Sequence, residues 1–210
     1  MQLQLALDLV NIPEAKEVVK EVEAYIDIVE IGTPVVINEG LRAVKEIKES
    51  FPGLKVLADL KIMDAGGYEV MKASEAGADI ITVLGVSDDS TITGAVQEAR
   101  KQNKKIMVDM INVRNLEERA REIDALGVDY ICVHSGYDHQ AAGKNSFEEL
   151  NAIKRVVKNA KTAIAGGIKL DTLPEVVKAN PDLVIVGGGI TGHEDKKSVA
   201  AEMQKLIKQG

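Results

Sequence analysis

Ionisable side chains stand at the ends of several short apolar runs in this 210-residue chain. The residues are Asp8, Glu30, Asp59, Lys61, Asp109 and His134. Any one of them alone could be a solvated or hydrogen-bonded residue at the end of a strand. Together they are hard to explain by solubility, because a buried charge without a partner costs several kcal/mol. We interpret the set as one shared site.

The pair Glu30 and Asp59 offers the chemistry of a divalent-metal site. Carboxylate oxygens are hard ligands of the kind that Mg²⁺ accepts while it keeps waters and substrate oxygens. The single cysteine, Cys132, leaves no cysteine cluster to favour zinc. Lys61 follows Asp59 by two residues, which places both on one face of a strand. An ammonium beside carboxylates stays protonated and can stabilise developing negative charge, although a structural ion pair is the alternative.

His134 follows the apolar run Ile131-Cys132-Val133 and precedes a loop that begins at Ser135. Imidazole titrates near neutrality and is the most common proton shuttle in enzymes. A histidine at the end of a strand is often only hydrogen bonded, so the sequence makes His134 a candidate acid–base group without fixing that role.

Two glycine turns follow the last two apolar runs, at Ala165-Gly166-Gly167-Ile168 and Val186-Gly187-Gly188-Gly189-Ile190. Glycines let backbone N–H groups approach an anion closely. In α/β barrels the loops after strands seven and eight frequently bind phosphate. We therefore expect Ala165, Gly166, Gly167, Gly188 and Gly189 to contact a phosphorylated substrate.

The apolar runs alternate with amphipathic charged segments, as βα units do. The expected strands are Leu3–Leu9, Asp27–Ile31, Lys55–Leu60, Asp79–Leu84, Lys105–Met110, Val128–Val133, Thr162–Ala165 and Leu183–Val186. The expected helices are Glu14–Ala24, Asn38–Ser50, Gly67–Ala76, Thr91–Gln102, Leu116–Leu126, Phe147–Lys158, Leu173–Lys178 and Glu194–Lys208. Eight such units predict an α/β fold, a single (β/α)8 TIM barrel that forms one catalytic domain over 1–210. The C-terminal ends of the strands would carry the chemistry.

Composition excludes several other classes of function. The net charge of −7 leaves no basic stripe for a nucleic acid. The longest apolar runs are strand-sized, well short of the roughly 20 residues that span a bilayer. One cysteine permits no internal disulfide, and the N-terminal residues do not resemble a signal peptide. We expect a cytoplasmic protein with neither nucleic-acid nor membrane partners.

Three motifs carry a family resemblance over essentially the whole chain. They are Asp59-Leu60-Lys61-Ile62-Met63-Asp64, Val29-Glu30-Ile31-Gly32-Thr33-Pro34 and the segment Val133–Gly143. The first resembles the orotidine 5′-monophosphate decarboxylase suprafamily, and the other two resemble its metal-dependent branch.

The resemblance implies roles for individual residues. Glu30 and Asp59 match magnesium ligands, with Mn²⁺ as a possible substitute, and Lys61 matches the catalytic lysine. Asp8 matches a substrate-binding aspartate, and His134 matches a histidine of proton transfer. Asp64 matches an aspartate that reaches the neighbouring site of a homodimer, so shared active sites are implied; capping of the third helix is the alternative.

The branch contains an aldolase that adds formaldehyde to D-ribulose 5-phosphate, giving D-arabino-3-hexulose 6-phosphate through a 1,2-enediolate. It also contains 3-keto-L-gulonate-6-phosphate decarboxylase. Asp109, Tyr137 and Ala165 stand where the decarboxylase has Glu, Arg and Thr, and these departures favour the aldolase. Gly189 stands where the decarboxylase has a phosphate-binding Arg.

Asp109 joins the catalytic candidates through this comparison. A pentose-phosphate epimerase is a less suitable alternative, because its site would need more metal-binding histidines than this sequence contains. A noncatalytic phosphate-binding barrel is the alternative from a different class.

Overall fold

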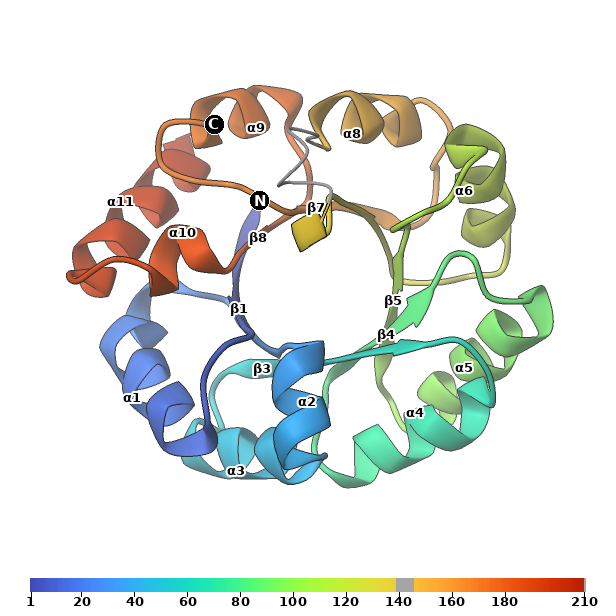
Figure 1. The fold of residues 1–210 in the computed structure, drawn as a ribbon. Coiled ribbons are helices and arrows are strands. Elements are labelled where there is room, and N and C mark those ends of the chain that lie inside the picture. Colours follow the sequence, from blue (N-terminus) through green and yellow to red (C-terminus); the bar gives the residue numbers. More distant parts are fainter. Residues whose placement is uncertain (139–145, 210) are drawn as a thin grey trace.

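The computed structural model describes residues 1–138 and 146–209, and its strands form a closed parallel barrel in sequence order (Figure 1). The strands are β1 (Gln2–Leu7), β2 (Ile28–Ile31), β3 (Lys55–Ile62), β4 (Ile80–Leu84), β5 (Lys105–Asp109), β6 (Tyr130–His134), β7 (Lys161–Ala165) and β8 (Leu183–Val186). The expected (β/α)8 barrel is confirmed. Residues 139–143 of the third motif lie outside the described residues.

Helices surround the barrel as an outer ring in Figure 1. They are α1 (Ile12–Val22), the 3-10 turn η1 (Glu23–Tyr25), α2 (Thr33–Glu39), α3 (Arg42–Ser50), α4 (Gly66–Glu75), α5 (Asp89–Lys101), α6 (Leu116–Ala125), α8 (Phe147–Lys154), α9 (Leu173–Ala179), α10 (Gly188–Thr191) and α11 (Lys196–Gln209). No described helix has the length and apolar character needed to cross a membrane.

Two short helices differ from the sequence-based expectation. We expected one helix over Asn38–Ser50, but the chain forms α2 and α3, separated at Gly40, whose φ is 64°. Pro34 in the first turn favours the earlier start of α2, because its fixed φ suits a helix and its missing N–H is not needed there. The second helix, α10, begins directly after β8 within the glycine turn.

The strands place side chains alternately inside and outside the barrel. The inner cluster is Ala6, Ile28, Leu57, Ile80, Met107, Tyr130, Cys132, Ala163, Ala165, Leu183 and Ile185. Leu5 and Leu7, on either side of Ala6, pack instead in the layer between the barrel and its helices. A polar residue two positions after an inner apolar residue therefore points into the C-terminal mouth of the barrel.

Aspartates fasten the opposite, N-terminal end of the barrel in a repeated way. Each precedes an even-numbered strand and accepts a hydrogen bond, 2.8 to 2.9 Å long, from a backbone N–H of the strand before it. The pairs are Asp27 with Leu3, Asp79 with Val56, Asp129 with Ile106 and Asp182 with Thr162. These bonds tie neighbouring strands together away from the C-terminal mouth.

Candidate active site

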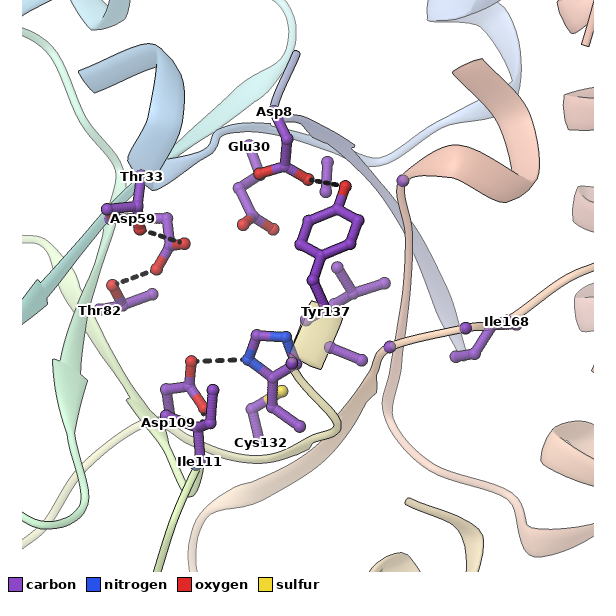
Figure 2. A pocket seen from close by; sticks show the side chains of 18 of the residues that line it. Asp8, Glu30, Thr33, Asp59, Thr82, Asp109, Ile111, Cys132, Tyr137 and Ile168 are labelled. Carbon is purple, nitrogen blue, oxygen red and sulfur yellow. Dashed lines mark hydrogen bonds and ion pairs between the residues drawn. The ribbon is translucent and has the colours of Figure 1, made fainter. Parts of the chain in front are cut away.

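A cavity of about 480 Å³ opens at the C-terminal end of the barrel. Of the residues predicted from the sequence, it is lined by Asp8, Glu30, Asp59, Lys61, Asp109, His134, Ala165, Gly166, Gly167, Gly188 and Gly189. Most side chains of this set follow an inner core residue by two positions, as Glu30 follows Ile28 and Asp59 follows Leu57. Figure 2 shows Asp8, Glu30, Asp59 and Asp109 around one space.

The ammonium of Lys61 lies among carboxylates. It forms an ion pair with Asp59, and its Nζ lies 3.6 Å from Oδ2 of Asp109 and 3.3 Å from Oγ1 of Thr33. Burial by itself lowers the pKa of Lys61, but the charges of Asp59 and Asp109 outweigh burial and raise this pKa above its ordinary value. The side chain is therefore a fixed cation.

Asp109 holds the ring of His134 in place. Its Oδ2 lies 2.9 Å from Nδ1 of His134, the contact dashed at Asp109 in Figure 2. Its Oδ1 accepts the backbone N–H of Ile111 at 2.9 Å. Burial opposes ionisation of Asp109, yet the contact with His134 and the charge of Lys61 keep its pKa below the usual range. An ionised partner on Nδ1 favours the tautomer with a proton there, so Nε2 is the nitrogen left for exchange with a bound molecule.

Glu30 is a buried carboxylate, and few neighbouring groups offset its negative charge. Burial, followed by the charges of Asp59 and Asp8, raises its pKa well above the ordinary value. Its hydrogen-bond partner is Gln4, whose Nε2 donates to Oε2 over 2.5 Å. Burial and then Asp59 also raise the pKa of Asp8, which accepts the hydroxyl of Tyr137 at 3.3 Å.

This surplus of negative charge fits a divalent cation. Asp8, Glu30, Asp59 and Asp109 line the cavity, and the ammonium of Lys61 contacts two of them, Asp59 and Asp109. Among the described residues, no three His, Cys, Asp or Glu side chains are spaced to hold a metal by themselves. A cation there would take two carboxylates and complete its shell with water and substrate oxygens, as Mg²⁺ does.

The glycine turns after β7 and β8 bring backbone close to backbone. Gly166 and Gly167 have φ values of 100° and 69°, which side chains rarely adopt. A Cβ atom on Gly189 would overlap the carbonyl oxygen of Ile168, whereas one on Gly188 would meet nothing within 4 Å. Position 188 therefore has room for a side chain, and position 189 does not.

Asp64 lies apart from this cavity. It is exposed on the turn between β3 and α4, and its Oδ1 accepts the N–H of the next residue, Ala65, at 2.7 Å. Ala65, rather than Asp64, is the N-cap of α4, and no side chain caps it. The alternative of Asp64 as the helix cap is therefore wrong, and the residue does not line the cavity of its own chain.

Several residues of the site were missed in the sequence, and four of them are polar side chains that contact or adjoin the predicted residues. Thr33 and Thr82 bind the carboxylate of Asp59, Gln4 binds Glu30, and Lys169 lines the cavity beside the first glycine turn. The alternation of side chains along a strand could have identified two of them. Thr82 follows the inner residue Ile80 by two positions, and Gln4 precedes the inner residue Ala6 by two, so both face the inside of the barrel. Thr33 and Lys169 lie beyond the strands, where no period applies.

Known proteins resemble this chain in sequence and in overall fold. A curated 3-hexulose-6-phosphate synthase of Bacillus subtilis (strain 168) is 80% identical over 210 residues, which is 100% of both chains. The 1.65 Å crystal structure of 3-hexulose-6-phosphate synthase from Salmonella typhimurium is 42% identical with a TM-score of 0.98, covering 100% of this chain and 99% of that chain.

A crystal structure of 3-keto-L-gulonate-6-phosphate decarboxylase from Vibrio cholerae is 26% identical with a TM-score of 0.86, covering 99% of this chain and 97% of that chain. The profile of one family matches residues 1–203. The chain belongs to the orotidine 5'-phosphate decarboxylase / HUMPS family.

Proposed function

We propose that this enzyme adds formaldehyde to D-ribulose 5-phosphate and forms D-arabino-3-hexulose 6-phosphate. The observation that carries the proposal is the fixed cation of Lys61, set between Asp59 and the Asp109–His134 pair. The relative at 80% identity, named 3-hexulose-6-phosphate synthase, supports this reaction. Such an activity on a phosphorylated sugar belongs in the cytoplasm.

Glu30 and Asp59 are the residues that would hold Mg²⁺, with Mn²⁺ as a substitute. A bound divalent cation supplies Lewis acidity toward the oxygens of the ketose. Asp59 keeps one lone pair of Oδ1 for this role, because Thr82 engages only the other one, whereas Thr33 and Lys61 both engage Oδ2. Burial and the charges of Asp59 and Asp8 raise the pKa of Glu30, and a cation bound beside it would offset this effect and favour the ionised form.

His134 would transfer the proton, and Lys61 would stabilise the negative charge that forms. Nε2 of His134 takes the proton from C1 of the ketose, and the ammonium of Lys61 stabilises the negative charge of the resulting 1,2-enediolate. C1 then forms a bond to the formaldehyde carbon, and the proton returns from His134 to the new alkoxide oxygen. Lys61 does not form a Schiff base in this scheme, because its raised pKa keeps it protonated.

The turns at Ala165, Gly166 and Gly167 and at Gly188 and Gly189 would receive the phosphate. All five residues line the cavity, and α10 begins at Gly188, so backbone N–H groups are available to an anion. Lys169 lines the same cavity and supplies a cationic side chain near the first turn. It is our candidate for the charge that the decarboxylase obtains from its arginine.

A homodimer with shared sites completes this proposal. Asp64 is exposed, and large apolar side chains are exposed on the segments that follow β1 to β4. They are Leu9, Ile37, Met63, Tyr68 and Val86, with exposed fractions from 44% to 83%. Exposed apolar side chains that gather in one region of a protein often mark a contact surface. We propose that a second copy covers them and receives Asp64 at its own cavity.

The decisive experiment measures the loss of formaldehyde when the purified protein is incubated with Mg²⁺ and ribulose 5-phosphate. Consumption that requires both the ketose and the metal supports the proposal, and Lys61→Gln should remove it. Lys178→Gln, on the outer helix α9, is the matched control and should retain it. No consumption with Mg²⁺ or Mn²⁺, together with release of CO2 from 3-keto-L-gulonate 6-phosphate, would instead assign the decarboxylase reaction.

A further inference from the structure

The end of β3 departs from regular strand geometry at Lys61. Ala58 pairs with Ile81 and Ile62 pairs with Val83, so residues 59–61 of β3 lie opposite one residue of β4, Thr82. Lys61 itself has a φ of 47°, in the left-handed region that non-glycine residues seldom occupy. Bulges and strained residues of this kind persist only where surrounding contacts hold them, and they often re-aim a functional side chain.

Thr82 makes the contacts that hold this bulge. Its Oγ1 donates to Oδ1 of Asp59 at 2.7 Å (Figure 2). The same Oγ1 accepts the backbone N–H of Lys61 at 2.9 Å. A hydroxyl has one proton and two lone pairs, so both bonds can exist together. Thr82 is buried, with 3% of its surface exposed, and water cannot easily replace the hydroxyl. One side chain thus joins the backbone of Lys61 to the carboxylate of Asp59.

Thr33 supports the same carboxylate from the other side and provides a contrast. Its Oγ1 lies 2.8 Å from the carbonyl oxygen and 2.9 Å from Oδ2 of Asp59. Its contact with Lys61 is through the ammonium, whereas the backbone N–H of Lys61 goes to Thr82. Thr33 therefore orients Asp59, whereas Thr82 couples the conformation of Lys61 to that of Asp59.

We propose that Thr82 is a positioning residue, whose hydroxyl holds the β3 bulge so that the Lys61 ammonium and the Asp59 carboxylate face the cavity in fixed register. The hydroxyl proton is committed to Asp59, so Thr82 acts through these two residues rather than on the substrate. The inference rests on the proposed function for its effect on turnover, but the coupling itself is a property of the free protein.

The test compares Thr82→Val, which keeps the shape and removes the hydroxyl, with Thr82→Ser, which keeps the hydroxyl. Misplacement of a catalytic group by about 1 Å costs about 10²-fold in rate, so Thr82→Val should lower kcat by about that factor. The KM for ribulose 5-phosphate should change little, because the phosphate turns are remote from β4. Thr82→Ser should recover most of the loss.

The matched control is Thr162→Val. Thr162 is also a buried strand threonine, and its Oγ1 lies 3.3 Å from a carboxylate oxygen of Asp182, but it lies at the N-terminal end of the barrel. Its loss should leave kcat and KM unchanged. If Thr82→Val does not fold, Thr82→Ala removes the same hydroxyl with less crowding and takes its place in every measurement.

A readout that is independent of turnover is amide hydrogen exchange of Lys61 in the free protein, measured by NMR. Removal of its acceptor in Thr82→Val should speed this exchange at least about tenfold at equal global stability, while Thr82→Ser should stay near the wild type.

Unchanged exchange, or a serine variant as slow in turnover as the valine variant, would overturn the inference. If the wild type consumes no formaldehyde, the proposed function fails, whereas the exchange comparison still decides the role of Thr82.

Discussion

The adjacent glycines at the start of α10, Gly188 and Gly189, allow a matched test of the close backbone approach in the proposed phosphate site. A methyl group at 189 would overlap the carbonyl oxygen of Ile168 and lie 2.9 Å from Cγ1 of Val186. A methyl group at 188 would meet no atom within 4 Å. Replacement of Gly189 by alanine therefore has to push the loop after β7 away from the end of β8.

The size of the effect follows from this crowding. Overpacking a dense interior costs about 1–3 kcal/mol, and we expect the upper part of that range because the obstructing atom belongs to the backbone. In a chain of this length about 1 kcal/mol shifts Tm by about 2–4 °C, so Gly189→Ala should melt roughly 4–12 °C below the wild type. Gly188→Ala should melt at or slightly above the wild type, because alanine within a helix is about 0.5–1 kcal/mol more favourable than glycine.

Thermal unfolding of both variants, followed by circular dichroism, checks the prediction on stability. Calorimetric titration of Gly189→Ala with inorganic phosphate checks the link to the site. Displacement of the turn at Ile168 should weaken phosphate binding about tenfold, which corresponds to about 1.4 kcal/mol. Equal melting temperatures for the two variants would refute the reasoning from close approach. If Gly189→Ala is destabilised but binds phosphate normally, the turn at these glycines is not part of the anion site.

Three further predictions concern Asp124, His134 and the sharing of sites between subunits. Burial alone would raise the pKa of Asp124, but the backbone N–H groups of residues 158–160 lower it. Its contribution to stability is therefore present above the ordinary aspartate pKa near 4 and is lost as the pH falls through the lower, folded-state value. In urea unfolding, Asp124→Asn should cost about 1–3 kcal/mol at pH 7 and clearly less in strong acid; a cost independent of pH would contradict this. His134→Asn should slow exchange of the C1 proton of ribulose 5-phosphate with deuterium by about 10²- to 10⁴-fold, as followed by NMR, and an unchanged rate would move the proton transfer to another group. Mixed Asp64→Ala and Lys61→Ala chains, each inactive alone, should recover up to about half the native activity per dimer, and no recovery despite proven subunit exchange would rule out a shared site.

Much of the barrel and the set of residues around its mouth could be predicted from the sequence, because the relevant signals are local. A strand places alternate side chains on opposite faces, so the apolar residue Ile28 and the carboxylate of Glu30 must share the inner face of β2. Parallel strands in a closed barrel present their C-terminal ends at one mouth. Period and chain order therefore suffice to bring Asp8, Asp109 and His134 to the same cavity.

Other features depend on contacts between segments that sequence spacing does not reveal. Simple alternation places Lys61 on the face of Asp59, but it does not predict the bulge, the φ of 47° or the hydroxyl of Thr82 across the neighbouring strand. Spacing likewise does not distinguish Gly188 from Gly189. That difference arises because the Ile168 carbonyl of another loop occupies the space beside Gly189 alone.

The order of the strands and the kinds of side chain at their ends can be read from the amino-acid sequence, since both follow from the local period of the backbone. Which of those groups touch depends on the closure of the barrel. Asp109 binds His134 and Lys61 at once because closure of the barrel sets the distances between β3, β5 and β6. Asp64, three residues beyond Lys61, turns away from the same cavity because β3 ends at Ile62 and the chain leaves the barrel there.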